Sequence, residues 1–114
     1  MSFKIIRKVS SRGEIREKIL DVPGELLHIG RGPLNELHLD DLTISLNHAE
    51  VRREEQGAYI LRDISQGQTI SLNRVPVKEA VLQPGDIITM ENYSVSVSQS
   101  MPGGPLVLSV EEGQ

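Results

Sequence analysis

The sequence predicts an all-β fold, either a sandwich or a barrel, and three observations carry this prediction. Short apolar runs alternate with turns rich in glycine, proline, asparagine and aspartate along the 114 residues, a pattern typical of sandwiches and barrels. No segment shows a sustained helical period. Residues 93–98 read Tyr-Ser-Val-Ser-Val-Ser, the two-residue period of a strand that buries one face.

The chain is expected to begin with a hairpin. Residues 3–9 and 14–20 are strand candidates, because a polar turn containing Gly13 separates them. A third strand over 25–31 follows, and Gly32-Pro33 ends it. Later strands are expected at 37–39, 43–45, 49–54, 58–64 and 93–98, with another opened by Gly85-Asp86.

The expected core consists of apolar residues that these strands turn inward. They are Ile5, Ile19, Ile29, Leu39, Ile44, Val51, Tyr59, Leu61, Leu72, Leu82, Ile87, Val95 and Val97. One domain over residues 1–98 is large enough to bury such a core without a metal or a disulfide. Residues 99–114 are expected to be a linker or C-terminal tail, in which 106–110 form either an added edge strand or the start of the tail.

Composition excludes several classes of protein. The chain has no cysteine, which removes zinc-finger and thiol-nucleophile interpretations and is compatible with a reducing compartment. Its formal net charge of −4 disfavours general nucleic-acid binding, which needs a basic face. No run approaches the roughly 18 apolar residues of a membrane span. We therefore expect a cytoplasmic protein without direct membrane contact, although an anchor beyond residue 114 stays open.

Two short segments carry the functional prediction. Gly30-Arg31 ends an apolar strand, and Ser45-Leu46-Asn47-His48 begins fourteen residues later. An arginine fork and a serine hydroxyl, each at a strand end, can converge on one phosphate, since bidentate guanidinium–phosphate pairing is a strong contact. Together with Asn73 and Gly85-Asp86 further along, this ordered set resembles the forkhead-associated (FHA) domain, a phosphothreonine-binding β-sandwich, over roughly residues 3–98.

The resemblance implies a fold and a set of roles. The fold is an FHA-like sandwich of two mainly antiparallel sheets with about 10–11 short strands. Arg31 and Ser45 would hold the phosphate, with Leu46 and Asn47 beside them. His48 would be structural, as would Gly30, Asn73, Gly85 and Asp86.

The chain departs from the family pattern at two places. The residue after the serine is usually arginine or asparagine, whereas this chain has Leu46, which cannot donate a hydrogen bond. The family's later loop usually reads Ser-x-Asn-Gly-Thr, in which the hydroxyl touches phosphate and the asparagine holds the peptide backbone. Residues 65–69 read Ser-Gln-Gly-Gln-Thr instead. An alignment counted back from Asn73 places Gly67 and Gln68 at the positions of the family's hydroxyl and asparagine. An alignment counted forward from Asp63 places Ser65 and Gln66 at these positions.

No catalytic, metal or cofactor site is expected. Ser45 and His48 are only three residues apart, and no nucleophile elbow is present. His28 and His38 recur with His48 at ten-residue intervals but lack a companion ligand cluster.

The sequence predicts a non-catalytic module that binds a phosphothreonine-containing protein or peptide, such as a Ser/Thr kinase substrate, in signalling or assembly. The alternative is a degenerate FHA domain that mediates phosphate-independent protein interaction or weak self-association.

Overall fold

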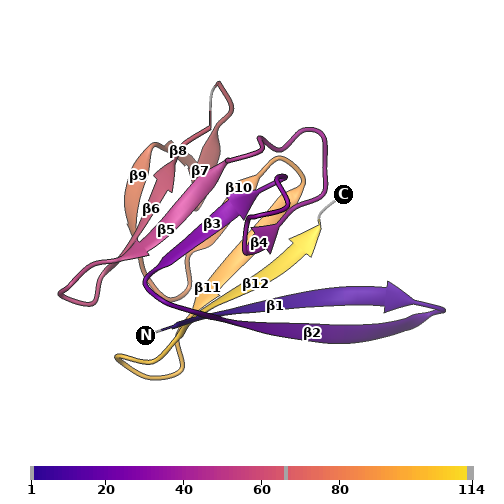
Figure 1. Cartoon of the computed structure of the whole chain (residues 1–114), viewed down its shortest axis with the longest axis horizontal. Helices are drawn as coiled ribbons and strands as arrows, with labels where there is room; N and C mark the ends of the chain where they lie inside the picture. The colour runs from indigo at the N-terminus through magenta and orange to yellow at the C-terminus, as the bar shows by residue number, and fades with distance from the viewer. Residues whose placement is uncertain (1, 66, 113–114) are drawn as a thin grey trace.

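The computed structural model describes residues 2–65 and 67–112, and it has the expected two-sheet architecture (Figure 1). Twelve strands run through these residues: β1 (Ser2–Ser11), β2 (Glu14–Pro23), β3 (Leu26–Gly30), β4 (Leu37–His38), β5 (Ala49–Arg53), β6 (Tyr59–Asp63), β7 (Ile70–Leu72), β8 (Val75–Val77), β9 (Glu79–Leu82), β10 (Ile87–Met90), β11 (Tyr93–Ser98) and β12 (Leu106–Glu112). Within them, no helix is long and apolar enough to cross a membrane.

The strands form one sheet of seven, in the order β2-β1-β12-β11-β10-β7-β8, and one of five, in the order β4-β3-β5-β6-β9. Pairing is mainly antiparallel, as expected, with parallel pairs at β1–β12 and β3–β4. The strand number exceeds the expected 10–11, because residues 70–82 contain three strands of only three or four residues each. Such short strands give little periodic pattern in a sequence.

Two local predictions are wrong. Residues 43–45 form a turn and not a strand, because the Asp41 carboxylate accepts hydrogen bonds from the backbone and the hydroxyl of Thr43 (2.8 and 2.7 Å). This local bonding competes with a sheet ladder. The second concerns residues 106–110, which were expected to form an added edge strand or the start of a tail. They belong to β12, which lies inside the large sheet between β1 and β11. The last strand therefore joins the first half of the chain to the second.

The core lies between the two sheets and contains most of the expected residues, with Phe3 packed edge-on against Tyr59 at a ring separation of 5.5 Å. Ile19 and Ile87 were expected in the core but are exposed, and Leu72 is only partly buried. Ile19 pairs with Ile6, but it lies in β2, an edge strand in which every residue except Val22 is exposed. In β10, Ile88 and not its neighbour turns inward.

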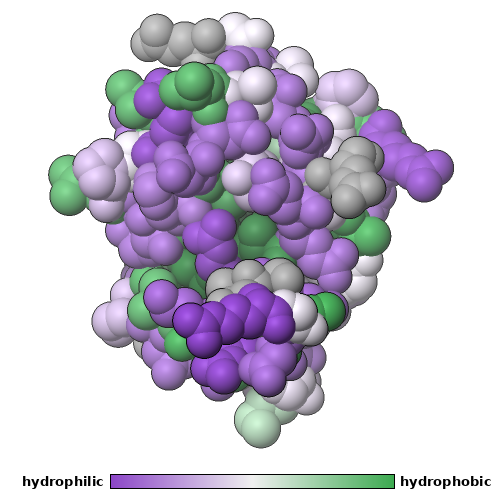
Figure 2. Space-filling model, turned by 90° about the vertical axis from the view of Figure 1, so that its right-hand side faces the viewer, coloured by the Kyte–Doolittle hydropathy of each residue, from purple (hydrophilic) through white to green (hydrophobic). Residues whose placement is uncertain are grey.

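The loops after β3 and β4 and the loop after β6 lie along the upper part of Figure 1, while the β1–β2 hairpin extends to the right. Figure 2 views the molecule from that side and shows a mainly hydrophilic surface, on which apolar residues form small, separate areas.

Candidate functional site

The two residues expected to hold a phosphate are neighbours in the structure. The Arg31 amide donates to the Ser45 carbonyl at 2.9 Å, and the Gly32 amide donates to the Leu46 carbonyl at 3.1 Å. The His48 amide donates to the carbonyl of Ile29, also at 2.9 Å. The segment before β5 thus continues the β3–β5 ladder beyond the regular strands, and this continuation brings Arg31 beside Ser45.

Hydrogen bonds of both its backbone and its side chain hold Arg31 in place. Its Nε–H donates to the Ile44 carbonyl at 3.1 Å, and its carbonyl lies 2.8 Å from Nε2 of His38, which must donate because a carbonyl only accepts. Arg7 of the hairpin in turn donates to the His38 carbonyl. In the described part of the chain the two terminal guanidinium nitrogens have no hydrogen-bond partner, so they are available to a ligand.

Beside this arginine lies an open hollow of about 380 Å³, lined by Arg31, Leu46, Asn47 and Ile64. Leu46 is 53% exposed and Asn47 is also exposed. Both line the hollow, and Leu46 and Ile64 give it an apolar wall.

Ser45 connects two loops. Its hydroxyl donates to Oε1 of Gln68 at 2.8 Å, which brings the later loop to the arginine side of the sandwich. Of the two ways of counting this loop, the geometry brings Gln68 to Ser45. Gly67, at φ +94°, forms the adjoining turn, and Gln66 lies outside the described residues.

Ser65 is bonded within its own loop. Its hydroxyl lies 2.6 Å from Oδ1 of Asp63 and 2.7 Å from the Gln68 carbonyl. Burial raises the pKa of Asp63, but the hydrogen bonds from Ser65 and the nearby Lys78 ammonium outweigh it, so that the pKa is lowered overall. Because the pKa of the Asp63 carboxyl is lowered in the folded state, this group stabilises the fold at pH values above its ordinary pKa. The stabilisation is lost as the pH falls through the lowered pKa.

His48 is fully buried and joins three segments. Its Nδ1 accepts from the Ser45 amide at 3.2 Å, and its Nε2 lies 3.4 Å from the Thr69 carbonyl. The His48 carbonyl accepts from the Ile64 amide at 3.0 Å. Because Nδ1 accepts, Nε2 is the ring nitrogen that faces the Thr69 carbonyl as donor, and the buried ring ties the segment before β5 to residue 69.

Asn35 is a positioning residue that sequence reasoning missed. It is buried, and its Nδ2 donates to the carbonyls of Gly32 (2.9 Å) and Leu46 (2.8 Å). One amide group thereby clamps the two loops that carry Arg31 and Ser45. The sequence shows only a polar residue after Pro33, which by itself is more typical of an exposed turn.

Gly30 permits this close approach. A Cβ atom there would lie 2.4 Å from the Leu46 carbonyl oxygen and 3.0 Å from Nδ2 of Asn35. The first contact is with backbone, which cannot move away without separating the loops. We expect Gly30→Ala to destabilise the fold by about 1–3 kcal/mol, measured by urea denaturation. Gly30 does not have a positive φ, so a loss there reports the close contact and not left-handed backbone strain. A Gly30→Ala domain as stable as the unaltered one would contradict this account.

Three expected structural residues lie together at the far end of β7. Asn73 donates to Asp86 Oδ1 (3.0 Å) and accepts from the Ile87 amide (2.9 Å), while Asp86 Oδ2 accepts from the Gln83 amide (2.8 Å). Asn73 and Arg74 both have positive φ, in the two-residue turn between β7 and β8. Gly85, at φ +97°, turns the chain into β10. This cluster secures the β7–β10 pairing and does not touch the hollow.

Comparison with known proteins agrees with this geometry. The family model of the FHA domain matches residues 27–91, more than half of the chain and the whole segment from Gly30 to Asp86. The chain belongs to the FHA domain family. Membership of this family explains both the two-sheet fold and the loops that carry Arg31 and Ser45.

Relatives of this FHA domain include bacterial regulators. An oxoglutarate dehydrogenase inhibitor of Corynebacterium diphtheriae is 34% identical over 64 residues, which are 56% of this chain and 44% of that protein. The glycogen accumulation regulator GarA of Mycolicibacterium smegmatis is 38% identical over 64 residues, 56% of this chain and 40% of that protein. The chain spans less than half the length of these curated relatives.

Solved FHA domains share the fold. One, from a structural and functional analysis of phosphothreonine-dependent FHA domain interactions, has a TM-score of 0.68 at 24% identity and covers 89% of this chain and 99% of its own. The FhaA FHA domain, solved in complex with the intracellular domain of another protein, has a TM-score of 0.58 at 26% identity, with 75% and 88% coverage.

Proposed function

We propose that this FHA domain is a non-catalytic module that binds phosphothreonine peptides of a partner protein, with Arg31 and Ser45 holding the phosphate. The observation that carries the proposal is the backbone pairing of Arg31 with Ser45 beside an open hollow that Arg31 lines, with the guanidinium terminus unengaged in the described residues. The phosphothreonine-dependent interactions named for an FHA domain of the same fold support it.

The phosphate would be held by a small number of strong bonds. A phosphothreonine carries a charge of about −1.5 to −2 and three acceptor oxygens, and the planar fork of Arg31 suits two of them. Each charge-assisted hydrogen bond is worth roughly 1.5–3 kcal/mol. Two or three such bonds with some peptide contacts reach about −8 kcal/mol, which corresponds to micromolar affinity.

Ser45 must change partner for this to happen. Its hydroxyl donates to Gln68 in the unbound domain, and a hydroxyl has only one proton to donate. A bound phosphate would take that proton, and the Gln68 amide would then be free to turn its NH₂ group toward the peptide. The longer glutamine side chain would carry out this contact at a greater cost in side-chain entropy than an asparagine.

A second function is favoured by one specific feature, the exposed Leu46 beside Ser45. If the domain is degenerate, Leu46 belongs to a phosphate-independent protein contact. The variant Leu46→Arg distinguishes the two functions. We expect it to tighten phosphopeptide binding by about ten-fold, equivalent to one additional bond of about 1.4 kcal/mol, measured by calorimetry.

Leu42→Arg is the matched control for this variant, because Leu42 is 87% exposed on the same connection but does not line the hollow. It should leave the affinity within about two-fold. Loss of partner capture by Leu46→Arg, with no gain in phosphopeptide affinity, would favour the degenerate module.

We also propose that the partner is a substrate of a Ser/Thr kinase and that the encounter takes place in the cytoplasm, without nucleic acid or direct membrane contact. The regulatory names of the relatives support a place in signalling. A degenerate peptide library with a fixed phosphothreonine, compared with the same library carrying threonine, tests the function. Selective retention of the phosphorylated library is expected, and equal retention would refute phosphate recognition.

A further inference from the structure

The outer face of the seven-stranded sheet is uncharged at its centre. One row crosses five adjacent strands in the order Ile87, Ser96, Ser109, Ile6 and Ile19, each residue directly opposite the next. Ile87 is 45% exposed and Ile19 57% exposed. The alternate residues of β10, β11, β12 and β1 fill the core, so the row faces away from the sandwich over these four strands. In β2 every residue except Val22 is exposed.

The rows on either side carry charges toward the border, and some of these charges are paired. One row runs from Thr89 through Ser94 to Glu111, and Lys8 lies 3.4 Å from the Glu111 carboxylate. The other runs from Ser98 through Val107 to Lys4, which lies 3.9 Å from Asp21. The large face is therefore hydroxyl-rich in its middle and charged at its margin, where Arg74 lines a hollow with Ile87, Thr89 and Ser94. Glu17 lies opposite Lys8 at the other margin.

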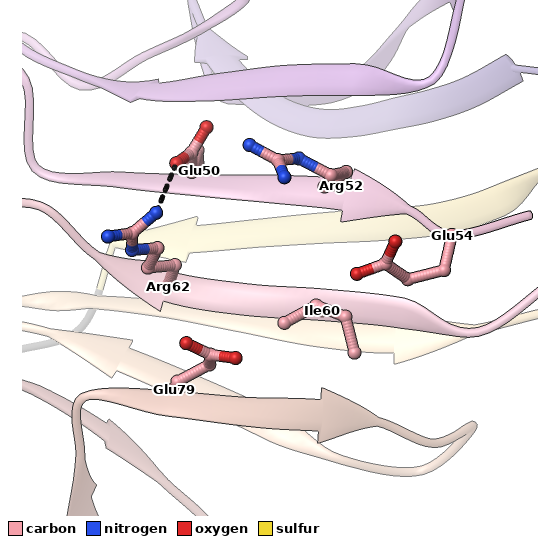
Figure 3. Close-up of a pocket in the computed structure, with 6 residues that line it drawn as sticks. All are labelled: Glu50, Arg52, Glu54, Ile60, Arg62 and Glu79. Carbon is pink, nitrogen blue, oxygen red and sulfur yellow. Dashed lines mark ion pairs between the residues drawn. The ribbon is translucent and has the colours of Figure 1, made fainter.

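The outer face of the five-stranded sheet is different. Its corresponding row is His28, Glu50, Arg62 and Glu79. Figure 3 shows the charged side chains lying across β5, β6 and β9, with Arg62 paired to Glu50 at 3.9 Å. Charged rows of this kind keep a sheet face in water. The uncharged row on the large sheet is thus a particular feature of that face.

We propose that the outer face of the seven-stranded sheet is the contact surface between two copies of this chain. Depletion of charged residues is the compositional mark of an interface core, and the row is self-complementary. A two-fold axis parallel to the strands, passing between Ser96 and Ser109, sets Ile87 against Ile6 of the second copy. It also sets Ser96 against Ser109 of that copy, and each hydroxyl can both donate and accept.

The dimer is weak and leaves the phosphate site open. Neighbouring strands are about 4.8 Å apart, so β10 to β1 span about 15 Å, which puts the contact at the small end of protein interfaces. We expect a dissociation constant in the micromolar range. Arg31 and Ser45 lie on loops at the end of the sandwich, outside this face, so dimerisation and phosphopeptide binding are separate properties.

Sedimentation equilibrium of the chain between about 5 μM and 1 mM tests the proposal. A monomer–dimer equilibrium is expected, and a monomer at every concentration would overturn it. Ser96→Glu should raise the dissociation constant at least ten-fold, because a two-fold axis places the new charge in the contact twice. Ile60→Glu, which introduces the same charge on the outer face of the small sheet, should leave it unchanged.

A charge pair tests the register itself. Ser109→Lys alone should also weaken self-association, whereas an equimolar mixture of Ser96→Glu and Ser109→Lys should dimerise at least as tightly as the unaltered chain. Circular dichroism of each variant verifies folding, and if one is unfolded the other still reports on the interface. A dimer insensitive to either folded variant, or a mixture that stays monomeric, would overturn the proposal. A fixed-phosphothreonine peptide library tests the phosphate site separately.

Discussion

Arg31→Ala is expected to remove the preference for phosphorylated peptide almost completely, with a loss of affinity of roughly 100-fold. The substitution deletes the guanidinium fork and its charge, and two charge-assisted bonds are together worth about 3 kcal/mol or more. About 1.4 kcal/mol corresponds to each ten-fold. Titration calorimetry with a library-selected phosphopeptide and its unphosphorylated twin measures the change, which should affect only the phosphorylated form.

Arg52→Ala is the control for this loss of binding, because Arg52 is an exposed arginine on the outer face of the small sheet. It should bind as the unaltered domain does. Arg31→Lys keeps the charge but not the fork, and should be intermediate. An Arg31→Ala domain that still discriminates between the two peptides would remove Arg31 from the phosphate site.

His48→Ala is expected to lower the free energy of unfolding by about 2–4 kcal/mol. The change opens a void in a fully buried position and leaves the Ser45 amide and the Thr69 carbonyl without their ring partner. For a domain of this size the melting temperature should fall by more than about 8 °C. Thermal and urea denaturation followed by circular dichroism give both quantities.

Asn47→Ala is the neighbouring control, because Asn47 is exposed, and it should melt within about 2 °C of the unaltered domain. Arg31→Ala should also melt nearly normally, since most of its side-chain donors are unengaged. A His48→Ala domain as stable as these controls would show that the histidine is not structural.

Much of the fold could be predicted because its strands are long enough to show their period. The alternation at 93–98 became β11, and the first hairpin became β1 and β2. What could not be predicted depends on long-range pairing. Nothing in residues 106–112 indicates that they insert between β1 and β11, since their partners are far away in the sequence.

The candidate site likewise has a part that could be predicted from the sequence and a part that could not. Arg31 directly follows β3 and Ser45 lies in the segment before β5, and their adjacency follows from the continuation of the β3–β5 pairing beyond the strands. The bond from Ser45 to Gln68 joins residues 23 positions apart, and Asn35 reaches Leu46 across 11. Both contacts depend on how the loops fold over each other, which neither composition nor period reports.

Titration of the ¹⁵N-labelled domain with a phosphothreonine peptide and with its unphosphorylated twin tests phosphate recognition by the loop end. Amide shifts are expected at Arg31, Ser45, Leu46 and Gly67 with the phosphorylated peptide and not with the twin. Shifts of equal size with both peptides, or shifts confined to a sheet face, would contradict phosphate recognition by this loop end.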